Sequence, residues 1–145
     1  MVLTDGVEIA LFPTCLIPPH RTESRTMPDS QDSISELTRR ICAFRDARDW
    51  AQFHGPKELA VALSAEAGEL LQHFVWQTPE QSAARAASRR VEIADEMADV
   101  AILLMEFAEV IRIPLGEAVA AKLARNEERY PVDKARGSNK KHNEL

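Results

Sequence analysis

Two pairs of acidic residues have the spacing that places carboxylates together on one face of a helix. Glu66 and Glu69 form the first pair, and Glu96 and Asp99 form the second. Residues three apart are neighbours on a helix surface, so each pair presents both carboxylates to the same side. Ionised carboxylates gathered between helices repel one another and lose hydration. Such a group therefore either binds protons or holds a cation.

The first pair lies in a segment from about residue 58 to residue 76 whose apolar residues recur with helical periodicity. The apolar stripe consists of Leu59, Leu63, Leu70 and Phe74. On a helical wheel Glu66 falls in the middle of this stripe and Glu69 lies at its edge. Charged side chains usually stay at the surface, so a carboxylate inside an apolar stripe is a candidate functional group.

The second pair lies in a longer helical segment, from about residue 89 to residue 111. Its apolar face is expected to consist of Ile93, Met97, Val100, Leu104, Phe107 and Ile111. Glu96 falls inside this arc and Asp99 lies on its flank. The remaining acids of the segment are expected to face solvent: Asp95, Glu106 and Glu109.

A site made only of carboxylate oxygens favours a hard cation, with Mg²⁺ as the first choice and Mn²⁺ as the second. Mg²⁺ usually keeps several water positions, which are the places where substrate phosphates bind. A carboxylate-bridged di-iron centre would need Glu-x-x-His on its helices. The third residue after Glu69 is Gln72, which disfavours that centre. Exposed acidic faces on both helices remain the alternative to a metal site.

Length and composition restrict the function further. The 145 residues correspond to one domain, and 18 basic against 23 acidic residues give a net charge of −5. This acidic balance argues against a nucleic-acid binder. No run approaches the ~18 apolar residues of a membrane span. The two cysteines, Cys15 and Cys42, suggest neither a disulfide framework nor a zinc site and suit a reducing cytoplasm. The sequence also lacks a glycine-rich phosphate loop.

The chain divides into three regions. Residues 1–30 contain four prolines and predict a flexible extension. For residues 1–26 the alternative is an upstream translation start that the native protein does not use. Residues 31–131 predict an all-α domain, most simply a four-helix bundle. Helix starts are indicated by a capping box at Ser33–Glu36, by Thr78 before Pro79, and by Pro114. Residues 132–145 predict a basic, flexible tail.

The acid pattern resembles a known signature. Glu66-Ala-Gly-Glu69 followed by Glu96-Met-Ala-Asp99 resembles the E-x-x-E and E-x-x-D motifs of the MazG-like all-α nucleoside triphosphate pyrophosphohydrolases. Flanking segments are similar to the dCTP pyrophosphatase-like branch: Arg48–Lys57, Phe74–Trp76 and Lys122–Pro131. The resemblance spans roughly residues 33–141. It implies Mg²⁺-dependent cleavage of a nucleoside triphosphate to the monophosphate and pyrophosphate, with the four acids as catalytic metal ligands.

The flanking segments also supply candidate substrate-binding residues. Aromatic and imidazole groups near the acid helix are suited to stack on a base, with core packing as the alternative: Trp50, His54 and Trp76. Cationic and polar groups are suited to phosphate and sugar, with plain solvation as the alternative: Lys57, Lys122, Asn126, Arg129 and Tyr130. Lys122, Asn126 and Tyr130 lie one turn apart on one helix face.

Base preference and assembly stay open at this stage. Mammalian dCTP-cleaving members have His and Tyr where this chain has Ile41 and Leu103, and many relatives have Asn where it has Glu58. The expected substrate is dCTP or a modified dCTP, with dUTP or a broad set of triphosphates as the alternative. A non-catalytic, metal-clipped helical dimer is the alternative to an enzyme. Ala-rich apolar surfaces on the last two helices predict a homodimer or a homotetramer, which would cover them.

Overall fold

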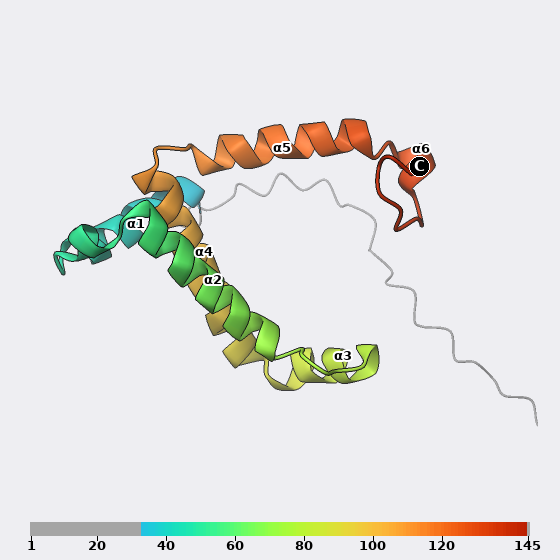
Figure 1. Cartoon of the computed structure of the whole chain (residues 1–145), viewed down its shortest axis with the longest axis horizontal. Coiled ribbons are helices and arrows are strands. Elements are labelled where there is room, and N and C mark those ends of the chain that lie inside the picture. The colour runs from blue at the N-terminus through green and yellow to red at the C-terminus, as the bar shows by residue number, and fades with distance from the viewer. Residues whose placement is uncertain (1–32, 145) are drawn as a thin grey trace, which may run out of the picture.

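A computed structural model describes residues 33–144 as a set of helices joined by short turns (Figure 1). No strand occurs within this range, so the all-α prediction is confirmed. The elements in chain order are α1 (Ile34–Asp46), the 3₁₀ turn η1 (Trp50–Phe53), α2 (Pro56–Gln72), α3 (Pro79–Ser88), α4 (Arg90–Val110), α5 (Leu115–Arg129) and α6 (Val132–Ala135). The expected N-terminal extension, residues 1–30, lies outside the described residues.

Side-chain caps start two of the helices. The hydroxyl of Thr78 accepts a hydrogen bond from the backbone N–H of Gln81, and the Gln81 side chain accepts one from the Thr78 N–H, completing a capping box. At α1 only half of the expected box forms. Ser33 accepts from the Glu36 N–H at 3.1 Å, but the Glu36 carboxylate pairs with Arg39 at 2.6 Å instead of turning back.

The centre of the fold is the antiparallel pair of α2 and α4, which lie side by side along their length (Figure 1). Helix α1 packs across α4 near its C-terminal end, and the short α3 joins α2 to α4 at the opposite end. Within the described residues, the buried apolar side chains are Leu59 of α2 and Ala108 of α4. The apolar core that these helices form is therefore small.

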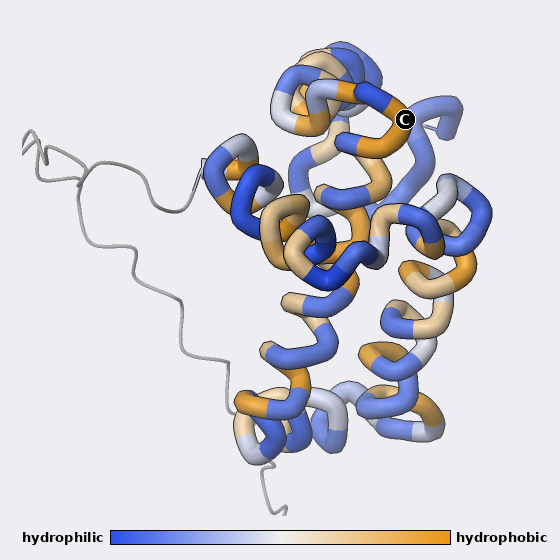
Figure 2. Tube along the Cα trace, turned by 90° about the vertical axis from the view of Figure 1, so that its left-hand side faces the viewer, coloured by the Kyte–Doolittle hydropathy of each residue, from blue (hydrophilic) through white to orange (hydrophobic). Residues whose placement is uncertain are grey.

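Helix α5 leaves this packed group and runs across its end, with its main contacts to α1 (Figures 1 and 2). It does not close a four-helix bundle within one chain. Large apolar side chains consequently remain exposed along α5, including Val119 and Leu123. Within the described part of the chain, no helix combines the length and the apolar character that crossing a membrane requires.

The structure corrects three expectations about side-chain placement. Glu106, expected in solvent, is 3% exposed, whereas Met97, expected in the apolar face, is 58% exposed, and Leu104 is partly exposed as well. The inward face of α4 is thus rotated from the predicted one, because α1 and η1 cover its C-terminal half from one side. Helix α2 also ends earlier, at Gln72, and a turn follows in which Trp76 has a left-handed backbone (φ 61°).

The tail expected to be flexible begins with a short helix, α6, directly after Pro131. Further along the tail, the ring of His142 meets the ring of Tyr130 edge to face, with ring centres 5.8 Å apart. This contact folds the end of the described chain back towards the C-terminus of α5.

Candidate active site

Three of the four predicted acids converge where α2 and α4 lie side by side. Glu66 of α2 and Glu96 and Asp99 of α4 each place a carboxylate oxygen within 4.8 Å of the others. Glu66 and Glu96 are partly buried and Asp99 is exposed. We call these three residues the acid cluster. The helical wheels explain it, since both Glu66 and Glu96 lie on the sides of their helices that face each other.

Glu69 lies at the margin of this cluster. It is exposed, and its oxygens are not within the same 4.8 Å group. The side chain still acts on its neighbour electrostatically, because its charge contributes to the pKa of Glu66. Its position at the edge of the α2 stripe matches the prediction from the helical wheel.

The electrostatics of the cluster favour an added positive charge. The pKa of Glu66 is raised above its ordinary value, first because the side chain is partly desolvated. Repulsion from neighbouring carboxylates raises this pKa further, by Glu69, Asp99 and Glu96 in that order. Oxygen atoms that are close together and short of counter-charge are the donor set that Mg²⁺ or Mn²⁺ prefers. The residues present therefore fit a hard divalent cation.

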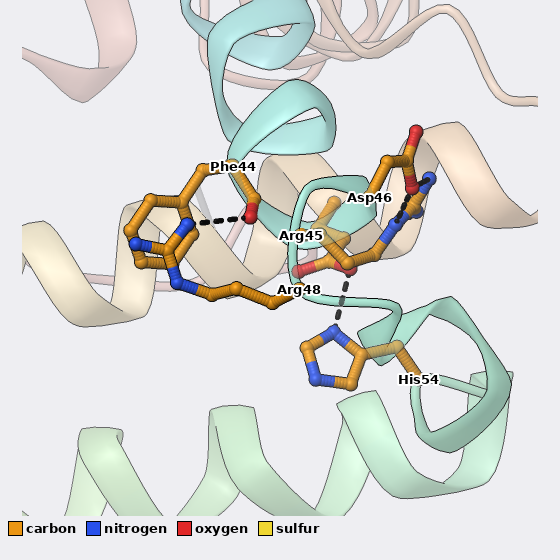
Figure 3. Close-up of polar contacts among 6 residues, drawn as sticks. Phe44, Arg45, Asp46, Arg48 and His54 are labelled. Carbon is orange, nitrogen blue, oxygen red and sulfur yellow. Dashed lines mark hydrogen bonds and ion pairs between the residues drawn. The ribbon is translucent and has the colours of Figure 1, made fainter.

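Residues 49–54, which include the turn η1, connect α1 to α2, and we call this segment the aromatic loop. Asp49 enters it with a left-handed backbone (φ 55°), and Gln52 donates hydrogen bonds to the Asp49 carbonyl and carboxylate at 3.0 and 2.8 Å. Trp50 follows, partly exposed, with its ring edge-on to Phe44 at 6.0 Å between centroids. The guanidinium of Arg48 lies over the Phe44 ring at 3.5 Å (Figure 3). This loop presents a flat, partly solvated ring that is suited to stacking.

His54 ends the aromatic loop and points away from solvent towards α4. Its Nδ1 lies 2.7 Å from Oε1 of Glu106, and Nη1 of Arg45 lies 3.5 Å from the same oxygen (Figure 3). Glu106 was expected in solvent, and nothing within α4 indicates this contact, because His54 and Arg45 lie 52 and 61 residues earlier in the chain.

Other predicted substrate-binding residues do not reach the acid cluster within one chain. Lys57 is 86% exposed, with its ammonium 3.7 Å from Glu58, and Trp76 is 96% exposed in the turn after α2. Lys122, Asn126, Arg129 and Tyr130 all lie on or just after α5. Within residues 33–144, α5 makes no substantial contact with α2, so these four side chains stand apart from the acids (Figure 1).

The chain is similar in sequence to known proteins. The sequence profile of the MazG-like family matches residues 61–145, a range that includes the whole acid cluster. The chain is 36% identical over 118 residues to dCTP pyrophosphatase 1 of Bos taurus, covering 80% of this chain and 70% of that protein. It is also 36% identical over 117 residues to dCTP pyrophosphatase 1 of Homo sapiens, covering 79% of this chain and 69% of that protein.

A solved structure has the same helical architecture. The crystal structure of a pyrophosphatase from Archaeoglobus fulgidus superimposes with a TM-score of 0.66 at 36% sequence identity. The match covers 72% of this chain and 98% of the archaeal one.

Proposed function

This chain belongs to the MazG-like family, and from that premise we propose that it is a nucleoside triphosphate pyrophosphohydrolase that acts on dCTP. The observation that carries the proposal is the convergence of Glu66, Glu96 and Asp99 within 4.8 Å. The dCTP pyrophosphatases among its relatives support the choice of substrate. The products would be dCMP and pyrophosphate, which is the reaction of an enzyme that cleans the nucleotide pool.

We propose Mg²⁺ as the cofactor, with Mn²⁺ as a substitute. Glu66, Glu96 and Asp99 would hold it, and Glu69 would join them once a cation removes the repulsion among the carboxylates. Bound there, the metal would polarise the phosphate oxygens and offset their charge. The carboxylates of α2 and α4 would also accept a proton from the attacking water, because several of them lie within reach of one site.

The aromatic loop is the proposed place for the base. Trp50 offers a partly exposed ring, and base stacking on such a ring contributes about 1–3 kcal/mol. Mostly apolar side chains of α1 and α4, among them Ile41, Phe44 and Ile102, line a cavity of about 520 Å³. Trp76 would add a second stacking surface if the turn after α2 approaches a bound nucleotide. His54 has a different role, which the next subsection develops.

The phosphate and sugar contacts require a second copy of the chain under this proposal. Lys122, Asn126, Arg129 and Tyr130 lie on α5, away from the acid cluster of their own chain. A homodimer, or a tetramer of two dimers, would bring α5 of one copy to the acids of another, and would cover the exposed apolar side chains of α5. Lys57, at the start of α2, would supply further positive charge. No nucleic-acid polymer is proposed as a partner, and the proposed compartment is the cytoplasm.

A nucleotide panel tests the function. The full chain is incubated with Mg²⁺ and each natural and 5-substituted deoxynucleoside triphosphate, and the products are separated by ion-exchange chromatography. The proposal expects dCTP or a 5-substituted dCTP to be cleaved fastest, with monophosphate and pyrophosphate in equal amounts. Faster cleavage of dUTP, or equal rates for all triphosphates, would contradict the base preference. Release of orthophosphate would contradict the bond cleaved, and no turnover at all would favour a non-catalytic metal-clipped dimer.

A further inference from the structure

Glu106 is a buried acid that the proposed reaction does not use. Among the residues that the structure describes, it is the charged side chain with the least exposure, at 3%. It lies on α4 where α1 and the aromatic loop cover that helix, well along the helix from the acid cluster. A buried carboxylate without partners is strongly destabilising, so the contacts that this one makes have to compensate for its lost hydration.

Two cationic or donor groups compensate Glu106, from two different segments. The Nδ1–H of His54 donates to Oε1 at 2.7 Å, and the guanidinium of Arg45 approaches the same oxygen at 3.5 Å. The Arg45 side chain is mostly buried and also pairs with Asp46 at 2.7 Å (Figure 3). The shorter contact is the one to His54. Glu106 is therefore attached more closely to the aromatic loop than to α1.

His54 is the point where the aromatic loop is fixed. Its ring centroid lies 6.2 Å from the centroid of Trp50, and the residue directly precedes Gly55, the N-cap of α2. The other end of the loop is closed by Gln52, which donates to Asp49. Because Glu106 belongs to the same helix as Glu96 and Asp99, its bond to His54 connects the Trp50 ring to the helix that carries two acids of the cluster.

We propose that Glu106 is a positioning residue that holds His54, and through it the Trp50 ring, at a fixed place relative to the acid cluster. This inference rests on the proposed function. Under it, the segments that bind the base and the triphosphate are held in a fixed relative position. Loss of this bond would weaken nucleotide binding and leave the metal-binding carboxylates in place.

The first test measures the solvent exposure of Trp50 in the aromatic loop, without any substrate. The chain contains two tryptophans, so Trp76→Phe leaves Trp50 as the only one. In this background we compare Glu106→Ala, Glu106→Gln and, as a matched control, Glu109→Ala, which removes an exposed acid three residues further along α4. Acrylamide quenching of Trp50 should increase at least twofold in Glu106→Ala. The Gln variant should stay near the parent, because its amide oxygen still accepts from His54, and the control should match the parent.

The second test measures nucleotide cleavage with Trp76 restored. Glu106→Ala should raise the KM for dCTP about tenfold while changing kcat less than about threefold, and Glu106→Gln should recover most of the lost affinity. The Mg²⁺ concentration for half-maximal activity should not change. If Glu106→Ala does not fold, His54→Ala takes its place, since it removes the same bond from the loop side and should produce the same rise in quenching and in KM.

The outcomes separate this inference from the proposed function. A lower melting temperature with unchanged Trp50 quenching and unchanged KM would mean that Glu106 only stabilises the fold, which would overturn the inference. Equal defects in the Gln and Ala variants would also overturn it. A chain that cleaves no nucleotide contradicts the proposed function, while the quenching experiment still decides whether Glu106 fixes the loop.

Discussion

At the residue scale, the carboxylates of the acid cluster repel one another unless a cation binds between them. Glu66 shows this most clearly, because burial and three neighbouring charges all raise its pKa. Glu106 is the opposite case, an acid that is more deeply buried but compensated by His54 and Arg45. The two sites share α4 but differ in their partners. Under the proposed function the acid cluster takes a cation from solution, whereas Glu106 is paired within the chain.

Removal of a metal-binding carboxylate should stop the reaction and leave the fold intact. Changing residues that merely support metal ligands costs ~10–100-fold in activity, so we expect Glu96→Gln or Asp99→Asn to lose more than about 100-fold. The comparison is steady-state cleavage of dCTP at saturating Mg²⁺, with circular dichroism to check helix content. Asp95→Asn, which alters an exposed acid next to Glu96, is the matched control and should keep its activity. Full activity in both ligand variants would remove the cluster from the mechanism.

The raised pKa of Glu66 predicts how stability depends on pH without metal. Because the folded chain holds the Glu66 proton more tightly than the unfolded chain does, this group contributes stability below the ordinary value of 4.5. That contribution is lost as pH rises through the raised pKa. In EDTA, Glu66→Gln should therefore melt at the same temperature as the parent at low pH and at a higher temperature at neutral pH. Melting curves that coincide across the whole range would contradict this.

At the element scale, local signals in the sequence predicted helix starts well. Thr78 and Pro79 predicted the start of α3, and Pro114 predicted the start of α5. These features depend on residues within one turn of each other, so the sequence contains all that is needed. The end of α2 was harder to predict from the sequence. Its apolar periodicity continues past Gln72, but the chain turns there to reach α3, and Trp76 is left in solvent.

The orientation of α4 needed information that no single helix contains. Periodicity placed Glu96 correctly between the helices, because Glu66 on α2 has a matching position. The same wheel placed Glu106 in solvent, since nothing in α4 itself indicates that α1 and His54 cover this position. Whether an acid on a helix is buried depends on partners distant in the chain, such as His54, which lies 52 residues earlier.

The cap of α3 can be tested separately from catalysis. Thr78→Ala removes the hydroxyl that accepts from the Gln81 N–H, and such a change costs about 1 kcal/mol of helix stability. Hydrogen exchange of the first amides of α3 should accelerate about fivefold, while the amides in the middle of α4 should not change. The matched control is Ser88→Ala, at the other end of α3 and outside the cap. Equal acceleration in both variants would show that the capping box does not determine the stability of α3.

At the scale of the whole molecule, the described helices leave many large apolar side chains exposed. Within the described residues the buried apolar side chains, Leu59 and Ala108, are few, and α5 extends away from the packed helices (Figure 1). The sequence predicted the main helices, and the second copy that it predicted to cover α5 stays a prediction. The sequence did not indicate how α5 is placed, because this helix makes few contacts with the other described helices.

Charge introduced on the apolar side of α5 should dissociate the proposed oligomer and reduce dCTP cleavage to the same degree. Val119 and Leu123 are exposed and lie one turn apart, and burying such side chains contributes ~1.5–3 kcal/mol each. We expect the double change Val119→Asp, Leu123→Asp to shift the mass measured by light scattering to that of a monomer. Cleavage of dCTP should fall in parallel, since Lys122 and Asn126 would no longer reach the acids of a partner. Arg125→Ala, on the opposite side of α5, should change neither quantity.

A wild-type chain that is monomeric and fully active at assay concentration would contradict the shared site, because the residues of α5 could then not reach the acid cluster of a partner.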